Sequence, residues 1–355
     1  MPNHSDSAKL GAKLVSTSYD VALKAGVSQS AVSRCFKKGA SVAPATRAKI
    51  LKAARELNYM PNAIAQGLIN RRSNLVAILI SNLTNLYYPE ALAELTQRLS
   101  ERGVRVLLFT LKTESDVKSA LAEVWRYRVD GVIAAAKLDN EAIGQLNARG
   151  VPLVLYNRQN DSIPVSSVSC DNFAGERLLV DLLAAAGHKR FGLIAGPSDS
   201  AVSQARVSGA VERLKELKLD FATVEGAYDY QSGRTGLHQL RKAMNNRLDA
   251  VIAANDVMAI GAVDAARFDL ELKVPKDLSI VGFDGVAPAA WAGYDLTTIC
   301  QPVHRMAEAA VAMVMERIES GEALPERRMY SGELRKGGSA RLKTPRPALI
   351  DAAKS

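Results

Sequence analysis

Short apolar runs recur along most of the chain, with stretches of helical periodicity between them. The runs occupy residues 75–81, 104–110, 130–136, 152–157, 190–196, 249–256 and 278–284. Each of the first six is followed by an amphipathic stretch such as "PEALAELTQRLSERG". Apolar strands that alternate with helices are typical of parallel sheets covered on both faces. The pattern therefore predicts an α/β body that begins near residue 74.

The grouping of these strands indicates two lobes. The strands are too many to form one compact sheet readily. The alternation of strands and helices also starts again after "SVSCDN" at 167–172. Ligands of open parallel sheets bind beyond the carboxyl ends of the strands. A cleft between two doubly wound lobes is therefore the expected ligand pocket.

Polar side chains follow several strands, where this cleft is expected. They are Asn82, Asn85, Asn157, Arg158, Ser198, Asp199, Asn255, Asp256 and Asp284. Amide, acid and guanidinium groups suit the binding of hydroxyls or of a small polar metabolite. The alternative is that Asn and Asp cap the following helices or turn the chain. Among these residues, Asn82, Asn85 and Ser198 fit the capping or turn alternative most readily.

The segment before residue 74 has a different pattern, with three helical stretches at 17–25, 28–38 and 44–58. Gly26 ends the first stretch and Ser28 can cap the second, which is the spacing of a helix-turn-helix. An ordinary helix pair has the same local pattern. The side chains expected to share a core are Val21, Ala22, Ala25, Ala31, Val32, Cys35, Phe36, Ile50, Leu51, Ala54 and Leu57.

The second helix is the expected reader of DNA bases, because a helix-turn-helix places the first residues of that helix at the base edges. Gln29 can bond adenine through two hydrogen bonds, Arg34 can bond guanine, and Ser30 can adapt to either. Ser28 and Ser33 complete the predicted DNA-binding surface of this helix.

The excess positive charge of the chain lies in this first segment. Residues 1–72 contain 12 Lys/Arg and 3 Asp/Glu, whereas residues 73–355 contain 34 of each. A basic module attached to a neutral body fits a polyanionic partner such as DNA. A disordered basic tail is the alternative explanation of the charge.

Residues 61–73 connect the basic segment to the body. Pro61 ends the preceding structure, and Asn62 can cap a short helix at 63–69. A helix of this length, with Gly67 inside it, needs a partner to fold, because isolated helices are stable only above about 12 to 15 residues. A plain linker is the alternative.

Several classes of protein are not supported. No apolar run approaches the roughly 20 residues that span a bilayer, and no signal-peptide stretch is present, so we expect a cytoplasmic protein. The three cysteines and four histidines lack disulfide or metal-ligand spacing. No G-x-G-x-x-G follows a strand and no P-loop lysine is found. We therefore expect no cofactor, no metal and no enzymatic activity.

The sequence resembles the LacI/GalR family of bacterial transcription regulators along nearly its whole length. The matching segments, in family order, are 19–34, 42–68, "AANDVMAIGA" (253–262), "VPKDLSIVGFDG" (274–285) and "LTTICQP" (296–302). In this family a hinge-helix leucine wedges into the minor groove of the operator. The resemblance assigns that role to Leu68, with Ala65 beside it and Asn62 at the start of the hinge helix.

The resemblance also implies an effector site between the lobes. The implied contacts are Tyr87, Asn157, Arg206, Tyr228, Asn255 and Asp284. Tyr228 would stack on a sugar or base face, while Arg206 and Asp284 would hold polar groups. Leu86 stands where the family usually has proline, and Asn157 where many sugar binders have aspartate. A standard hexose or ribose is therefore not assumed.

The expected fold is an N-terminal all-α helix-turn-helix domain followed by an α/β body of two parallel-sheet lobes, similar to periplasmic binding proteins. The expected boundaries are 1–16 for a flexible extension, 17–60 for the DNA-binding domain, 61–73 for the hinge, 74–343 for the effector-binding and dimerisation domain, and 344–355 for a flexible tail. Within the body, the first lobe is expected at about 74–167 and 303–322, and the second at about 168–300 and 326–340.

We therefore expect a transcription regulator, most simply a repressor, that binds a palindromic operator in double-stranded DNA as a homodimer under control of a small-molecule effector. Such a protein works at the bacterial nucleoid, away from membranes. A DNA-binding sugar kinase is the enzymatic alternative, but it would need a phosphate-binding glycine loop that the sequence lacks. A secreted solute-binding protein shares the two-lobed body but not the basic head.

Overall fold

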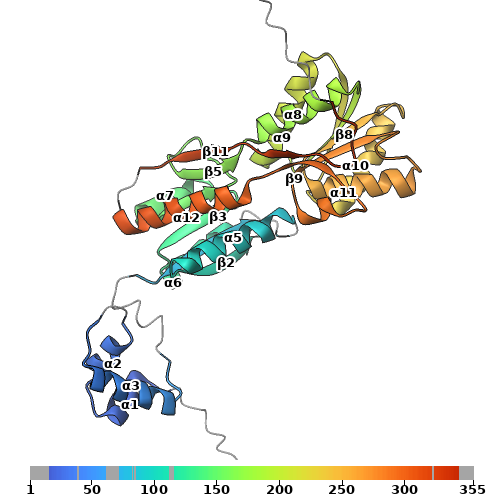
Figure 1. Cartoon of the computed structure of the whole chain (residues 1–355). Helices are drawn as coiled ribbons and strands as arrows, with labels where there is room; N and C mark the ends of the chain where they lie inside the picture. Colours follow the sequence, from blue (N-terminus) through green and yellow to red (C-terminus); the bar gives the residue numbers. More distant parts are fainter. Residues whose placement is uncertain are drawn as a thin grey trace, which may run out of the picture. The chain divides into compact units, whose positions relative to one another are not determined.

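The computed structural model describes residues 16–37, 40–60, 72–81, 83, 85–111, 116–321 and 324–343. The chain divides into two compact units, Met1–Ser73 and Asn74–Ser355. We call them the head and the body and describe each by itself (Figure 1).

The head contains three helices, α1 (Ser18–Ala25), α2 (Gln29–Cys35) and α3 (Pro44–Glu56). Thr17 caps α1 in a capping box with Asp20, and Gly26 ends that helix in the left-handed conformation with φ of 64°. The Ser28 side chain caps α2, as the sequence predicts. These local signals fix the turn between the two helices.

The three helices of the head share one small core. Its buried members are Val21, Ala22, Val32, Cys35, Ile50, Ala53 and Ala54, and Ala25, Ala31, Phe36, Leu51 and Leu57 pack partly buried against them. The predicted core is therefore confirmed, with Ala53 added. Its apolar side chains come from all three helices, which makes the head a unit with its own core.

The first lobe of the body is a six-stranded parallel sheet in the order β11-β5-β4-β3-β1-β2. Its elements are β1 (Leu75–Ser81), α5 (Tyr87–Glu101), β2 (Arg105–Leu111), α6 (Asp116–Tyr127), β3 (Gly131–Ala135), α7 (Asn140–Ala148), β4 (Leu153–Tyr156), β5 (Ser166–Cys170), α12 (Val303–Ser320) and β11 (Arg327–Tyr330). Alternate residues of β1 pack into two different apolar clusters, with helices α5 and α12 in one and α6 and α7 in the other. Both faces of the sheet are therefore covered.

The second lobe repeats this plan, with the strand order β12-β10-β9-β8-β6-β7. Its elements are α8 (Asn172–Ala185), β6 (Arg190–Ala195), α9 (Ala201–Glu216), β7 (Asp220–Glu225), α10 (Tyr230–Ala243), β8 (Ala250–Ala253), α11 (Asp256–Asp264), a π-helical turn (Ala265–Asp269), β9 (Ser279–Asp284), a 3₁₀ turn (Ala287–Ala290), β10 (Thr297–Cys300) and β12 (Glu333–Arg335). Only β12 among these strands runs antiparallel to its neighbour. The first five strands of each lobe follow the same doubly wound order.

The chain passes between the lobes three times, after β5, after β10 and after β11. The dark-red segment that carries β11 can be followed from the first lobe into the second in Figure 1. Two predicted lobe limits are therefore wrong. The second lobe does not begin at residue 168, because β5 pairs with β4 and extends to Cys170, and β11 joins the first sheet rather than the second.

The predicted alternation of strands and helices fails at one point. The run 152–157 forms β4 but is followed by β5, and the next helix is α8. The sequence "SSVSC" of β5 contains small hydroxyl residues instead of an apolar run, yet every one of them is buried between neighbouring strands. Because β5 lacks an apolar run, the sequence pattern does not predict this strand, although it lies inside the sheet.

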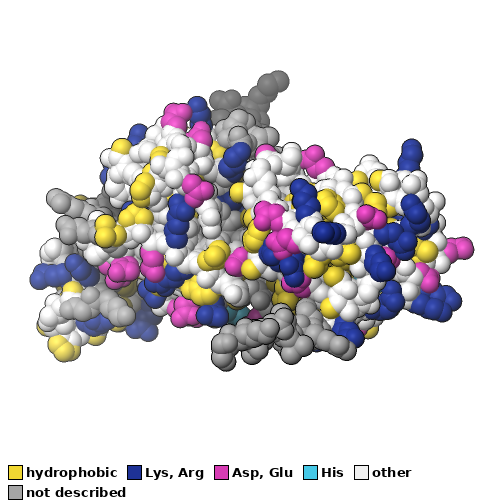
Figure 2. Space-filling view, turned by 90° about the horizontal axis from the view of Figure 1, so that it is seen from above, with side chains coloured by type: hydrophobic (Ala, Val, Ile, Leu, Met, Phe, Trp, Pro, Cys, Tyr) yellow, Lys and Arg dark blue, Asp and Glu magenta, His cyan; other side chains and the backbone are white. Residues whose placement is uncertain are grey.

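Positive and negative side chains are both spread over the face of the molecule drawn in Figure 2. Within the part of the chain that the structure describes, no helix is both long and apolar enough to cross a membrane.

Helices α10 and α11 approach each other closely through glycine. A Cβ atom on Gly233 of α10 would lie 2.1 Å from the carbonyl oxygen of Met258 in α11, and one on Gly261 would lie 2.1 Å from that of Tyr230. A backbone atom cannot move aside as a flexible side chain can. Glycine is therefore required at these positions for α10 and α11 to pack this closely in the second lobe.

We expect Gly233→Ala to lower the free energy of unfolding of the body by about 1 to 3 kcal/mol, because overpacking shifts the backbone. Chemical denaturation followed by circular dichroism measures this change. Gly144→Ala in α7 is the matched control, since its Cβ would meet no atom within 4 Å. The control should gain about 0.5 to 1 kcal/mol from helix propensity. Equal effects of the two substitutions would contradict the packing argument.

Candidate ligand site and DNA-binding surface

A cleft lies where the carboxyl ends of the strands of the two lobes face each other. Its lining residues are Asn85, Tyr87, Tyr88, Asn157, Arg158, Ser200, Val202, Arg206, Tyr228, Asp284 and Gln301. The space between them is about 20 Å³, enough for one water molecule. A sugar-sized molecule can therefore enter only if the lobes or the lining side chains move.

Arg206 of α9 is the centre of the polar network in this cleft, and its side chain is 2 % exposed. The guanidinium donates hydrogen bonds to Asp284 Oδ1 at 2.8 Å, to Asn172 Oδ1 at 2.8 Å and to the Ala254 carbonyl at 2.5 Å. It also lies 3.8 Å from the centre of the Phe283 ring. These contacts join α8, β9 and the end of β8 around one buried cation.

Asp284 sits at the end of β9 in an unusual backbone conformation, with φ of 123°. The conformation is held by Asp256, whose carboxylate accepts hydrogen bonds from the N–H groups of Gly285 and Val286 at 2.7 and 2.9 Å. Burial raises the pKa of Asp284, while Arg206, Gln301 and the nearby Asn85 lower it. A strained backbone that neighbouring groups hold in place is characteristic of a binding site.

Gln301 connects the two lobes across the cleft. Its Nε2 donates to Asp284 Oδ1 at 2.8 Å in the second lobe, and its Oε1 accepts from Asn157 Nδ2 at 3.2 Å in the first. Asn157 Oδ1 and Asp284 Oδ2 are buried and have no hydrogen-bond partner in the described part of the chain. Each lobe therefore presents one unused acceptor to this cleft.

Three tyrosines and Val202 form the apolar part of the lining. The Tyr87 hydroxyl donates to the Tyr156 hydroxyl at 3.2 Å inside the first lobe, and burial raises the pKa of both groups. The Tyr88 ring packs edge-on against Tyr87. Tyr228 packs so closely on Gly196 that a Cβ there would lie 2.3 Å from the ring. These contacts fix the rings in place around the cleft.

The structure brings together five of the six expected effector contacts, namely Tyr87, Asn157, Arg206, Tyr228 and Asp284. Asn255 does not line the cleft. It is fully buried, caps α11 by accepting from the Met258 N–H, and donates to the Tyr228 carbonyl at 3.1 Å. Asn255 is thus placed behind Tyr228, because both ends of its amide are used by the protein.

Sequence reasoning did not assign several of the lining residues as effector contacts. Asn85 and Arg158 belong to the predicted strand-end set, but the sequence favours a capping role for Asn85 and does not distinguish Arg158 from its neighbours. Ser200 and Tyr88 give no signal of their own. Gln301 lies in the segment "LTTICQP", whose place between the lobes becomes visible only in the folded chain.

Some of the DNA-binding residues predicted on α2 make contacts within the head, and others are exposed. Ser30 and Arg34 are exposed, and the Arg34 Nε donates to the Ser30 carbonyl at 3.4 Å. Gln29 is half-buried and donates to Ser18 Oγ at 3.3 Å, which orients its amide. Ser28 is used as the cap, and Ser33 is half-buried. The hinge residues Asn62, Ala65 and Leu68 lie outside the described residues, as does Asn82.

Among the described residues, no group of three His, Cys, Asp or Glu side chains is arranged to hold a metal ion.

Family models match both units of the chain. The model of the bacterial regulatory proteins of the lacI family matches residues 17–62, and that of the periplasmic binding protein-like domain matches residues 180–340. The HTH-type transcriptional repressor PurR of Yersinia enterocolitica is 30 % identical over 88 % of this chain and 93 % of its own length. The HTH-type transcriptional regulator DegA of Bacillus subtilis is 28 % identical over 82 % of this chain and 88 % of its own length.

Solved structures show the same relationship. The lac repressor dimer bound to operator and the anti-inducer ONPF matches with a TM-score of 0.83 at 29 % identity, over 91 % of this chain and 98 % of that one. The complex of the transcriptional regulator CelR with cellobiose matches with a TM-score of 0.70 at 29 % identity, over 91 % of this chain and 99 % of that one. The chain therefore belongs to the lacI family of bacterial regulatory proteins, and it is a DNA-binding transcription regulator rather than an enzyme.

Proposed function

We propose that this regulator represses transcription by binding a palindromic operator as a homodimer, and that a small polar metabolite in the interlobe cleft controls this binding. The pair of unused acceptors, Asn157 Oδ1 and Asp284 Oδ2, carries the proposal for the ligand, because buried acceptors are normally satisfied. As its partner is chromosomal DNA, we place the protein in the bacterial cytoplasm.

The lining favours a neutral ligand with several hydrogen-bond donors and one flat or apolar face. Its donors would satisfy the acceptors of both lobes, and its face would lie on the fixed tyrosine rings. A sugar or a related polar metabolite has this chemistry. The solved complex of CelR with cellobiose supports this class of ligand.

Ligand control follows from the small size of the cleft. A molecule larger than one water must change the position of the lobes or of the lining side chains, and Gln301 ties both lobes to the site. A ligand shifts the equilibrium toward whichever lobe arrangement it binds better. The first lobe continues directly into segment 61–73, so we propose that its movement decides whether the hinge, through Asn62, Ala65 and Leu68, enters the minor groove.

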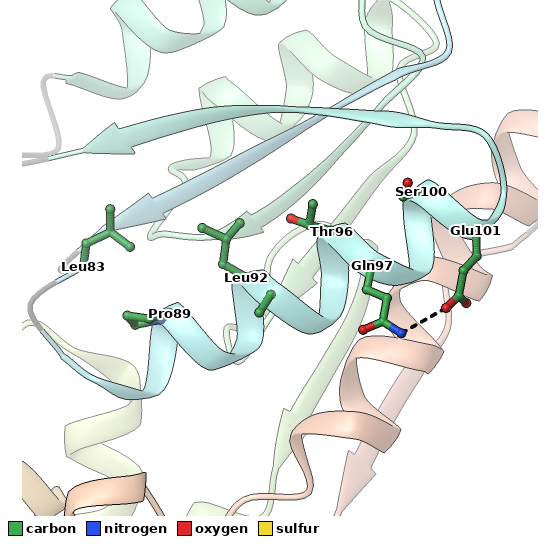
Figure 3. A pocket seen from close by; sticks show the side chains of 8 residues that line it. Leu83, Pro89, Leu92, Thr96, Gln97, Ser100 and Glu101 are labelled. Carbon is green, nitrogen blue, oxygen red and sulfur yellow. Dashed lines mark hydrogen bonds between the residues drawn. The ribbon is translucent and has the colours of Figure 1, made fainter.

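An open apolar groove along α5 is the surface that we propose for a second copy of the chain. It is lined by Leu83, Pro89, Leu92, Ala93, Thr96, Gln97, Ser100 and Glu101. Figure 3 shows Leu83, Pro89 and Leu92 toward one end of this groove and a hydrogen bond from Gln97 to Glu101 at the other. Reading a palindrome needs two heads related by a twofold axis. The solved lac repressor, a dimer on its operator, supports this occupant.

We expect Ala93→Glu to raise the dimer dissociation constant at least about tenfold, which corresponds to about 1.4 kcal/mol. A charge in the centre of a self-complementary apolar contact is placed there twice and loses its water. Sedimentation at several concentrations measures the effect. Ala148→Glu, on an exposed position of α7, is the matched control and should stay dimeric. An unchanged dissociation constant in Ala93→Glu would exclude the groove.

Arg34→Ala should weaken operator binding by about 1 to 3 kcal/mol and relax the base preference at one position of each half-site. Selection of bound duplexes from a random pool, with variant and wild-type chains in parallel, measures both effects. The control is Lys52→Ala on the exposed surface of α3, which should keep the selected sequence. Equal weakening on all duplexes would make Arg34 a phosphate contact.

Asp284→Asn should remove the ligand response while operator binding persists, because the amide preserves size but replaces an acceptor and its charge with a donor. A thermal-shift screen with neutral sugars, polyols and nucleobases identifies a stabilising ligand of the wild type, since a bound ligand stabilises the body by mass action. The variant should bind that ligand at least about tenfold more weakly, or by about 1.4 kcal/mol.

Asp199→Asn is the control for this experiment, because Asp199 is an exposed strand-end acid outside the cleft. Its thermal shift should equal that of the wild type. A full response in Asp284→Asn would show that the ligand binds elsewhere.

A further inference from the structure

Glu176 of α8 is a buried acid that the proposed control mechanism does not use. Its side chain is 2 % exposed, and neither of its carboxyl oxygens has a hydrogen-bond partner in the part of the chain that the structure describes. Burial of an unpaired carboxyl group is costly, so its presence in the core of the lobe needs an explanation.

The position of Glu176 relates it to Arg206. Glu176 follows Asn172 by one helical turn, and residues four apart share a face of a helix. On that face, Asn172 already accepts a hydrogen bond from Arg206 Nε. Glu176 and Arg206 also line the same small space of about 10 Å³. The Glu176 side chain therefore lies close to the buried Arg206 side chain.

Few other charges face Glu176. Helix α9 contributes Arg206 and the end of β9 contributes Asp284, and these are the charges that act on the carboxyl group. The remaining residues around the shared space are apolar, namely Leu193, Ile194, Val207, Ala210, Ile252 and Ala254. Two carboxyl groups thus compete for one guanidinium.

At neutral pH, Asp284 is the carboxyl that pairs with the cation. Asp284 accepts from Arg206 at 2.8 Å, whereas burial raises the pKa of Glu176 to about 8, which keeps it protonated. Arg206 makes three hydrogen bonds through its side chain, and a guanidinium has five N–H donors. It therefore retains donors for a second carboxylate.

We propose that Glu176 is the reserve counter-ion of Arg206: when the donors of a ligand draw on the Asp284 carboxylate, Arg206 turns spare N–H groups to Glu176, which releases its proton to solvent. This inference rests on the proposed function only in taking Asp284 as a ligand contact. The O–H bond of the acid breaks, the proton goes to water, and no electrons are transferred. Ligand affinity then rises with pH until the free chain has also lost this proton.

A double-mutant cycle on the full chain without ligand tests the exchange. Asp284→Asn takes the carboxylate away from Arg206, as a ligand would do, and Glu176→Gln removes the reserve while keeping its size. Urea unfolding of the body at pH 7 gives the folding equilibrium constant of the four chains. We expect Glu176→Gln alone to change this constant little or to raise it.

In the Asp284→Asn background, Glu176→Gln should lower the folding constant at least about tenfold, because the buried guanidinium then has no carboxylate at all. The expected double-variant effect is thus much larger than the product of the two single effects. Effects that simply multiply would overturn the proposal.

The pH dependence of the same four chains is a second measurement. An acid whose pKa rises on folding, here from 4.5 to about 8, makes folding less favourable as pH increases through that window. Glu176→Gln should remove this loss in the wild-type background. In the Asp284→Asn background, Glu176 should instead make folding more favourable as pH increases, because pairing with Arg206 lowers the pKa of Glu176.

The charge of Asp284 contributes to the raised pKa of the buried Asp256, so Asp284→Asn changes the titration of Asp256 as well. The effect of Glu176→Gln is therefore taken within each background, where the contribution of Asp256 is common to both chains. If Glu176→Gln changes the pH dependence of folding with the same sign in both backgrounds, the proposed exchange is wrong. Since no ligand takes part, this result is independent of the ligand-response experiment on Asp284→Asn, which tests the cleft itself.

Discussion

The buried guanidinium of Arg206 organises the second lobe around the cleft. It holds α8 through Asn172, β8 through the Ala254 carbonyl and β9 through Asp284. A cation at this depth costs several kcal/mol unless its partners keep their geometry. The positions of these three elements are therefore coupled, and the backbone strain at Asp284 is maintained by the same arrangement, with Asp256 as its second support.

Gln301 extends this coupling from the second lobe to the first. It lies on one of the three crossovers and bonds Asp284 on one side and Asn157 on the other. A change in the hydrogen bonding of Asp284 thus alters a group that also bonds the first lobe. This gives the cleft a direct physical connection to the relative positions of the lobes, which is what control by a ligand requires.

The sequence predicted the elements whose burial leaves a clear pattern. Apolar strands such as β1 and β9 and the cap at Ser28 were found because the local residues determine them. The central strand β5 was missed, since its serines are buried by neighbours that are distant in sequence. The same limit applies to the cleft: Asn255 and Asn157 are both strand-end amides, and their position at a strand end does not show that one caps a helix while the other faces the ligand space.

The three crossovers also determine when the protein can complete its fold during synthesis. Val76, Ile78 and Ile80 of β1 pack in the same cluster as residues of α12, which are made some 220 residues later, and β11 adds the outermost strand later still. On the ribosome, the first lobe therefore waits with part of its apolar face uncovered while the second lobe is translated. Such an intermediate exposes apolar surface and is prone to aggregation, so the first lobe can complete its fold only after translation has passed the last crossover.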